Sequence, residues 1–261
     1  MADPSHEKAD EVRDIFKFKP AEQLPLTHRC KHYRARFEVP YFAQRYSIFS
    51  RYNEGIRLTD DAWFGVTPEP IASKTLELFG DNSVIIDAFA GAGGNTIAFA
   101  RSKRWKRIIA VEQDAETLAC AQHNASIYLE DPSPIIWVLG DSFAFLDAAI
   151  RENHKLHPDL RLNLCRAVIF ASPPWGGPGY RTDEIFDLQR MQPYGLPTLH
   201  SAYDTMDHVL YLPRTSNIRQ IADLAEDGQR IDLVQYCMEG ASKGMVAYIP
   251  HDKARRELIL K

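Results

Sequence analysis

This 261-residue chain lacks three features that would point to other classes of protein. It has only four cysteines, none in a CxxC pair and none with a histidine at zinc spacing, which predicts reduced thiols and no metal site. No apolar run approaches the roughly 20 residues of a membrane span, so we expect a soluble protein without a membrane partner. An excess of positive charge is missing too. The net charge of −4 disfavours bulk electrostatic binding of long nucleic acid and leaves room only for a short, local contact.

The length suits one substantial domain with a fully buried sheet and a modest extension. We place the extension at residues 1–66, with a helix expected from Ser5 to Phe16, and the main domain at residues 67–261. Residues 1–19 mix acidic and basic side chains without an apolar core, so they resemble neither a secretory signal nor a transit peptide. We therefore expect a cytoplasmic or nuclear protein.

Basic and aromatic side chains interleave between His28 and Arg51. That alternation suits contacts with phosphates and bases. An amphipathic helix with its aromatic residues packed inward gives the same pattern, so both interpretations stay open at this point.

From Ser83 onward, short β-rich runs alternate with helical runs, which predicts a doubly wound α/β sheet. The last two β-rich runs flank a link too short for a crossover helix, so they should form an antiparallel hairpin. A mostly parallel seven-stranded sheet with such a C-terminal hairpin is typical of class I methyltransferases, whereas a dehydrogenase sheet would continue parallel. The predicted strands are Ser83–Asp87, Arg107–Val111, Ile135–Leu139, Arg166–Phe170, His208–Leu212, Ile231–Cys237 and Gly244–Ile249; the predicted helices lie near Asn95–Ser102, Asp114–Tyr128, Ser142–Glu152 and Asn217–Leu224.

The first of these strands ends in an acidic tip and runs through a glycine-rich turn into a helix. Glycines are needed where a ligand approaches the backbone closely and the chain turns sharply. Asp87 at the strand tip would repel a pyrophosphate but attract the ammonium of an amino-acid moiety, which favours S-adenosylmethionine over NAD. The loop residues predicted to hold this cofactor are Asp87, Ala88, Phe89, Gly91, Gly93 and Asn95.

Two further acids follow the next two predicted strands. Glu112 lies about 20 residues past the glycines, where a carboxylate accepts both ribose hydroxyls. Asp141 could accept the adenine amino group. A single acid at such a position is more often a helix cap, and we expect Asp114 and Ser142 to be caps. Three acids at three successive strand ends nevertheless predict a ligand lying across the carboxyl edge of the sheet.

The fourth strand leads into Ser172-Pro173-Pro174-Trp175-Gly176-Gly177-Pro178. Two adjacent prolines stiffen the turn, so a rigid carbonyl acceptor and an aromatic face are presented together. An exocyclic amine needs such a site, because the base must be held by stacking while its amine protons are accepted and the methyl group transfers in line. Ser172 and the carbonyl of Pro173 or Pro174 are the predicted acceptors, and Trp175 is the predicted stacking platform. A surface loop with Trp175 in a core is the alternative.

These motifs resemble those of the trimethylguanosine synthases, which add two methyl groups to the 2-amino group of a 7-methylguanosine cap. The resemblance runs from about Tyr41 to Ile249. It rests on Gln44-Arg45-Tyr46, Phe49-Ser50-Arg51, the run Trp63–Glu69, Asp87-Ala88-Phe89, Gly93-Gly94-Asn95-Thr96, the loop Ser172–Pro178, Tyr180 and Leu212-Pro213-Arg214.

The resemblance implies roles for individual residues. Thr67 and Phe49 join Asp87, Glu112 and Asp141 in holding S-adenosylmethionine, whose product is S-adenosylhomocysteine. Trp175 stacks on the methylated guanine, which agrees with the fixed positive charge of that base. Tyr180 and Arg214 meet the cap phosphates. Members of the family often have a lysine where this chain has Pro40, so Arg36, Arg45 or Arg51 is expected to replace it.

The implied substrates are 7-methylguanosine-capped small nuclear and nucleolar RNAs, with RNP proteins as partners and a nuclear, nucleolar or cytoplasmic location. The alternative enzyme modifies an adenine or guanine amino group inside an RNA or DNA strand, which predicts a continuous basic groove that the net charge disfavours. A third possibility is a cap-binding module without catalysis.

Overall fold

A seven-stranded sheet organises the computed structural model, which describes residues 16–35, 42–75, 84–177, 183–238 and 240–251. The strand order is β3-β2-β1-β4-β5-β7-β6, with β1 to β5 parallel and β7 antiparallel to both β5 and β6. The predicted fold class is therefore confirmed. The strands are β1 (Val84–Asp87), β2 (Arg107–Glu112), β3 (Ile135–Leu139), β4 (Ala167–Ala171), β5 (Asp207–Leu212), β6 (Asp232–Met238) and β7 (Ala241–Ile249).

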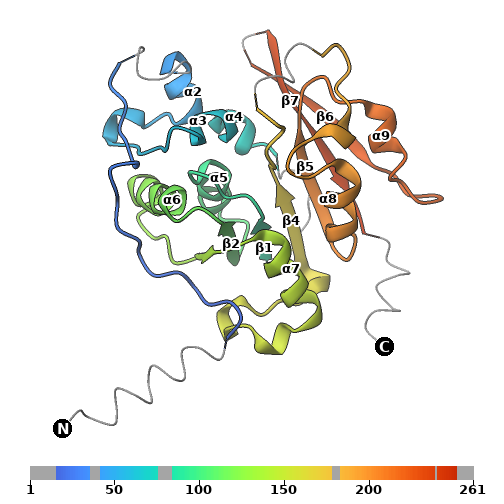
Figure 1. Ribbon diagram of the computed structural model, residues 1–261, viewed down its shortest axis with the longest axis horizontal. Coiled ribbons are helices and arrows are strands. Elements are labelled where there is room, and N and C mark those ends of the chain that lie inside the picture. Colours follow the sequence, from blue (N-terminus) through green and yellow to red (C-terminus); the bar gives the residue numbers. More distant parts are fainter. Residues whose placement is uncertain (1–15, 36–41, 76–83, 178–182, 239, 252–261) are drawn as a thin grey trace.

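The helices of four turns or fewer that connect these strands cover both faces of the sheet (Figure 1). Helix α8 was missed by the sequence prediction, because its Gly-Leu-Pro start reads as a loop. The helices are α2 (Arg45–Ile48), α3 (Ala62–Gly65), α4 (Glu69–Ala72), α5 (Gly94–Ser102), α6 (Ala115–Tyr128), α7 (Ser142–Arg151), α8 (Leu196–Tyr203) and α9 (Ile218–Ala222). None of the described helices is long and apolar enough to cross a membrane.

Alternate residues of the central strands point into two separate cores. Ile86 of β1 packs with Phe145 of α7 and Leu199 of α8. Its neighbour Ile85 packs with Phe99 of α5 on the opposite face, in the core that also holds the aromatic residues of the N-terminal region. Strands buried on both faces read as continuous apolar runs, which is why the sequence pattern located them well.

The hairpin of β6 and β7 is tighter than predicted. β7 begins at Ala241, three residues before the predicted Gly244, and the pairing reaches Met238 opposite Ala241. The pairing of β5 with β7 ends at Leu212 opposite Met245. Continuing that antiparallel register by two residues brings Arg214, just after β5, next to Lys243 in β7.

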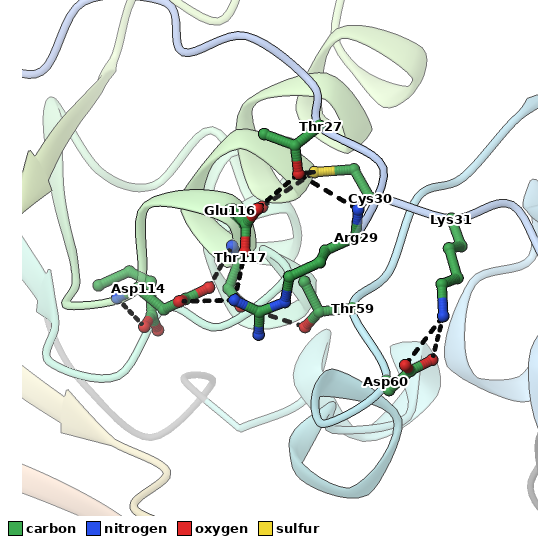
Figure 2. A network of polar contacts seen from close by, with 10 residues as sticks. Thr27, Arg29, Cys30, Lys31, Thr59, Asp60, Asp114, Glu116 and Thr117 are labelled. Atoms are coloured by element: carbon green, nitrogen blue, oxygen red, sulfur yellow. Dashed lines mark hydrogen bonds and ion pairs between the residues drawn. The ribbon is translucent and has the colours of Figure 1, made fainter.

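Residues 16–35, called the strap below, run past α6 to the group formed by α2, α3 and α4 (Figure 1). Figure 2 shows the Arg29 guanidinium between Asp114 and Glu116, at the start of α6. Thr27 Oγ1 donates to Glu116 Oε1 at 2.6 Å, and the backbone of Lys31 pairs with Leu58. The strap thus connects the N-terminal region to the helix that follows β2.

The described residues between the strap and α4 form no helix longer than four residues. α2 and α3 have four residues each, joined by 3₁₀ turns at Phe42–Gln44 and Tyr52–Glu54. Phe49 and Tyr52 from this region are 2% and 1% exposed, so its aromatic side chains largely pack inward. The helix predicted from Ser5 to Phe16 lies outside the described residues, apart from Phe16 itself. The boundary at residue 66 stays a prediction.

Candidate active site

A cavity of about 770 Å³ opens at the carboxyl edge of the parallel strands. Its walls come from the segments that follow β1 to β5, together with residues 61–68 and the start of β7. Loops at this edge of a doubly wound sheet are where ligands bind. Of the predicted site residues, the cavity is lined by Thr67, Ala88, Phe89, Gly91, Asn95, Glu112, Asp141, Ser172, Pro173, Pro174, Trp175 and Arg214.

The glycine-rich loop is shaped by contacts with its neighbours. Gly93 has a φ of 89°, and a Cβ at this position would lie 3.2 Å from the Cα of Ala121 in α6. Any other residue at this position would therefore have a strained backbone, and its side chain would crowd Ala121. Gly93 accordingly supports the loop from behind, while Gly91 lies on the cavity wall.

Asp87 does not reach the cavity, which corrects the prediction that it meets the cofactor's ammonium directly. Its side chain is fully buried, and its Oδ2 accepts a 2.6 Å hydrogen bond from Thr96 Oγ1. Oδ1 has no partner among the described residues. Burial raises the pKa of Asp87 to about 7, although the hydrogen bonds from Thr96 and from the Phe89 backbone act in the opposite direction. The carboxyl group faces the first turn of α5, and its hydrogen bond with Thr96 stabilises the glycine-rich loop.

Glu112 lies on the cavity wall at the end of β2. Its Oε2 accepts from the Gly91 amide at 3.0 Å, and its Oε1 accepts from the Asp114 amide at 2.9 Å. Burial raises the pKa of Glu112, and the backbone hydrogen bonds from Asp114 and Gly91 oppose the rise. A carboxylate has about four acceptor positions, so Glu112 retains capacity for ribose hydroxyls.

Asp141 combines two roles that the sequence presented as alternatives. Its Oδ1 accepts from the Ala144 amide at 2.8 Å and caps α7. Its Oδ2 faces Tyr194 Oη at 3.5 Å and remains available on the cavity wall. The cap of α7 is thus Asp141 and not Ser142, which is the first helical residue, whereas Asp114 caps α6 as predicted.

Two buried polar atoms on residues of the cavity wall have no partner among the described residues: Asn95 Oδ1, an acceptor, and Trp63 Nε1, a donor. Asn95 Nδ2 donates to Thr67 Oγ1 at 3.1 Å, which fixes the amide with its oxygen unpaired. Buried polar atoms without a partner are rare and call for a ligand. An acceptor and a donor together match the ammonium and carboxylate of an amino acid. The wall therefore fits the methionine part of S-adenosylmethionine, and Trp63 is a wall residue to which sequence reasoning gave no individual role.

The reaction loop lies across the cavity from the acids. Trp175 Nε1 donates to the Tyr211 carbonyl at 3.3 Å, and its ring lies 5.5 Å from the Tyr211 ring, tilted by 41°. The residue is half-buried and lines the cavity, so it is both anchored in the fold and presented to a ligand. Gly176 and Gly177 have φ values of 88° and 84°, which lets the chain turn away directly after the indole.

The described cavity wall carries charges of both signs. Asp61, Glu112 and Asp141 are its acidic residues, whereas Arg214 and Lys243 are its cationic residues. Gln235 Nε2 donates to the Arg214 carbonyl at 3.3 Å and to Ser242 Oγ at 2.7 Å, which holds the two cation-bearing segments side by side. Lys243 was missed because only the β5 and β7 register reveals it.

Three predicted ligand contacts lie elsewhere. Phe49 is 2% exposed and belongs to the core, where it packs against Tyr128. The Arg45 guanidinium lies over the rings of Phe42 and Tyr46 and donates to the Phe42 carbonyl. Arg51 forms an ion pair with Glu54. None of the three lines the cavity. Arg36 and Tyr180 lie outside the described residues.

Comparisons with known proteins identify the family of the chain. The model of the family of RNA cap guanine-N2 methyltransferases matches residues 82–252. Trimethylguanosine synthase of Schizosaccharomyces pombe is 31% identical over 214 residues, which are 80% of this chain and 84% of that protein. Trimethylguanosine synthase of Saccharomyces cerevisiae is 31% identical over 190 residues, which are 70% of this chain and 56% of that protein.

Among solved structures, a protein of Porphyromonas gingivalis W83 assigned as a methyltransferase superposes with a TM-score of 0.59. It is 14% identical, and the match covers 80% of this chain and 47% of that one. At this identity the likeness concerns the fold alone. The family match and the two yeast relatives go further: the chain belongs to the RNA cap guanine-N2 methyltransferases, whose methyl donor is S-adenosylmethionine.

Proposed function

We propose that the protein transfers two methyl groups to the exocyclic 2-amino group of 7-methylguanosine caps, giving 2,2,7-trimethylguanosine. The observation that carries the proposal is the single cavity that joins an acidic cofactor end, the Ser172–Trp175 loop and the cations Arg214 and Lys243. Such an arrangement accommodates a cofactor, a base and a short run of phosphates. It is also the arrangement expected for a family that modifies capped RNA.

At the cofactor end, Glu112 accepts the ribose hydroxyls and Asp141 Oδ2 accepts the adenine amine. Asn95 Oδ1 and Trp63 Nε1 take the amino-acid moiety, because both are unpartnered on the wall. S-adenosylmethionine supplies a methyl group activated by its sulfonium. The acidic wall suits this cation, since Asp61, Glu112 and Asp141 are all carboxyl residues.

At the base end, Trp175 stacks on the guanine, and the positive charge of a 7-methylated ring strengthens that contact. Ser172 and the Pro173 carbonyl accept the amine protons. The 7-methyl charge also acidifies the amine, so Ser172 need not be a strong base and positioning supplies most of the catalysis.

At the phosphate end, Arg214 and Lys243 bind the triphosphate bridge of the cap. Lys243 thereby takes the place of the cation missing at Pro40, since Arg45 and Arg51 are committed to other partners. Two cations suit the few phosphates of a cap. They do not make the continuous basic groove that an enzyme acting inside a strand would need.

The resemblance to trimethylguanosine synthases supports small nuclear and nucleolar RNAs as the capped substrates. It equally supports RNP proteins as partners and a nuclear, nucleolar or cytoplasmic location. Immunoprecipitation of the tagged protein, followed by sequencing of the bound RNA and fractionation of the cell, tests all three.

The deciding experiment is methyl transfer to the dinucleotide caps m7GpppA and GpppA, read by mass spectrometry. We expect a gain of two methyl groups on m7GpppA and none on GpppA. Equal modification of GpppA or of an uncapped oligonucleotide would favour the enzyme that acts inside a strand. Binding of both ligands without any gain in mass would mean a cap-binding module.

A further inference from the structure

Tyr194 is a cavity residue to which neither the sequence motifs nor the family assignment gives a role. It follows the reaction loop in the chain but lies beside Asp141, the acid after β3. Its ring is 4.3 Å from the Phe143 ring and 6.3 Å from the Phe89 ring. Three aromatic rings from three different segments thus form one cluster, and the hydroxyl of Tyr194 connects this cluster to Asp141.

The two oxygens of Asp141 are not equivalent. Oδ1 is occupied by the Ala144 amide at the start of α7. Oδ2 is therefore the oxygen left for a ligand, and the Tyr194 hydroxyl approaches it at 3.5 Å. This distance is at the outer limit of a hydrogen bond, and such contacts shorten when a ligand closes the site. Burial and the nearby Asp141 raise the pKa of Tyr194, so its hydroxyl stays protonated at neutral pH and can only donate to the carboxylate.

We infer that Tyr194 binds the cofactor: its ring forms one wall of the adenine pocket, and its hydroxyl orients Asp141 Oδ2 as acceptor for the adenine 6-amino group. The inference rests on the proposed function, which places S-adenosylmethionine in this cavity. Pro193 lines the same wall, and Phe89 lines it from the glycine-rich loop. A wall of two aromatic rings and a proline beside one carboxylate oxygen fits a purine that carries an amine.

The same geometry predicts selectivity between purines. An adenine amine donates to Asp141 Oδ2. A 6-oxo purine would instead place a carbonyl oxygen against that carboxylate, leaving two acceptors face to face. Sites built to accept a ligand's N–H discriminate strongly against analogues that lack it, because buried polar groups are then left unpaired.

Isothermal titration with S-adenosylhomocysteine and its 6-oxo analogue, S-inosylhomocysteine, tests the inference. The variants are Tyr194→Phe and Tyr194→Ala. Tyr203→Phe is the matched control, since Tyr203 stacks on the same Phe143 ring but does not line the cavity, and its hydroxyl has no hydrogen-bond partner among the described residues. Melting curves of all four proteins show whether each variant is folded.

We expect the wild type and Tyr203→Phe to prefer S-adenosylhomocysteine strongly. Tyr194→Ala should bind it about tenfold more weakly, as expected for the loss of an aromatic wall and a hydrogen bond to a charged group. Tyr194→Phe keeps the wall, so its affinity for S-adenosylhomocysteine should fall about threefold while its affinity for S-inosylhomocysteine stays nearly unchanged, which lowers the preference about threefold. A purely structural Tyr194 would weaken both ligands equally and leave the preference unchanged.

Unchanged affinity and unchanged preference in a folded Tyr194→Ala protein would overturn the inference while leaving the proposed function intact. Failure of the wild type to bind S-adenosylhomocysteine would instead contradict the proposed function itself. The two failures are therefore distinguishable in one set of titrations.

Discussion

The burial of Asp87 makes a quantitative prediction about stability against pH. An exposed aspartate loses its proton near pH 4, whereas burial raises the pKa of Asp87 to about 7 in the folded protein. Between these values the folded state binds a proton that the unfolded state has released, so the free energy of unfolding falls as pH rises. The stabilisation is fully present below the unfolded pKa and is lost as pH passes through 7.

The size of the effect follows from the shift. Three pKa units at about 1.4 kcal/mol each correspond to about 4 kcal/mol across the whole window, of which about 2–3 kcal/mol falls between pH 5 and pH 8. Asp87 is fully buried, so solvent screening does not reduce this figure. Asp87→Asn removes the titration and still offers Thr96 an acceptor.

Urea unfolding of the wild type and of Asp87→Asn at several pH values between 5 and 8 measures the effect. Titrating groups that do not interact with Asp87 contribute equally to both proteins and cancel in the difference, whereas Glu112, whose charge raises the pKa of Asp87, is coupled to it. Between pH 5 and pH 8 we expect the free energy of unfolding of Asp87→Asn to rise by about 2–3 kcal/mol relative to that of the wild type. A difference that stays constant with pH would show that Asp87 titrates like an exposed acid. The carboxylate would then face the cavity after all, and the correction of its role would be wrong.

Three further predictions concern the cavity wall. Asn95→Ala should weaken S-adenosylhomocysteine binding more than Asp87→Asn does, since Asn95 and not Asp87 lies on the wall. The reverse order, measured by calorimetry, would mean that Asp87 binds the ammonium group of the ligand. Trp175→Ala should lose at least 1–2 kcal/mol of cap affinity, about tenfold, with Trp175→Phe intermediate and cofactor affinity barely changed. Joint loss of cap and cofactor binding, or a collapsed melting curve, would make Trp175 a core residue. Arg214→Ala and Lys243→Ala should each weaken binding of m7GpppA while sparing 7-methylguanosine monophosphate, as measured by fluorescence titration. Equal losses for both ligands would indicate structural roles.

The sequence predicted the fold well because the central strands β1, β2, β4 and β5 are almost entirely buried, and β3 is strongly apolar. Apolar runs such as Ile135–Leu139 were located without error, and the short link after β6 revealed the hairpin. Helix α8 and the exact start of β7 were missed, because both depend on tertiary packing against the sheet and not on local turn signals.

Residues of the cavity wall could be predicted from the sequence where they lie at the ends of parallel strands. Glu112 and Asp141 follow the ends of parallel strands, so both had to come to one edge of the sheet. Asp87 shares that edge, but the direction of its carboxyl group depends on Thr96, one helical turn into α5. An acidic residue at the end of a strand therefore indicates that it lies at the carboxyl edge of the sheet. It does not show which side of the following loop its side chain faces.

The sequence also did not show which basic side chains line the cavity. The Arg51 guanidinium binds an acidic residue three positions later in the chain. The Arg45 guanidinium contacts a backbone carbonyl and two aromatic rings within three positions. Both groups therefore interact with partners that are close in the sequence. A basic residue with such a neighbour in a helical turn is a weak candidate for a ligand contact. Arg214 and Lys243 lie 29 residues apart and meet only because β7 returns antiparallel beside β5. Sequence motifs identify a phosphate site poorly when strand register assembles it, and strand register is the property that a single sequence specifies least directly.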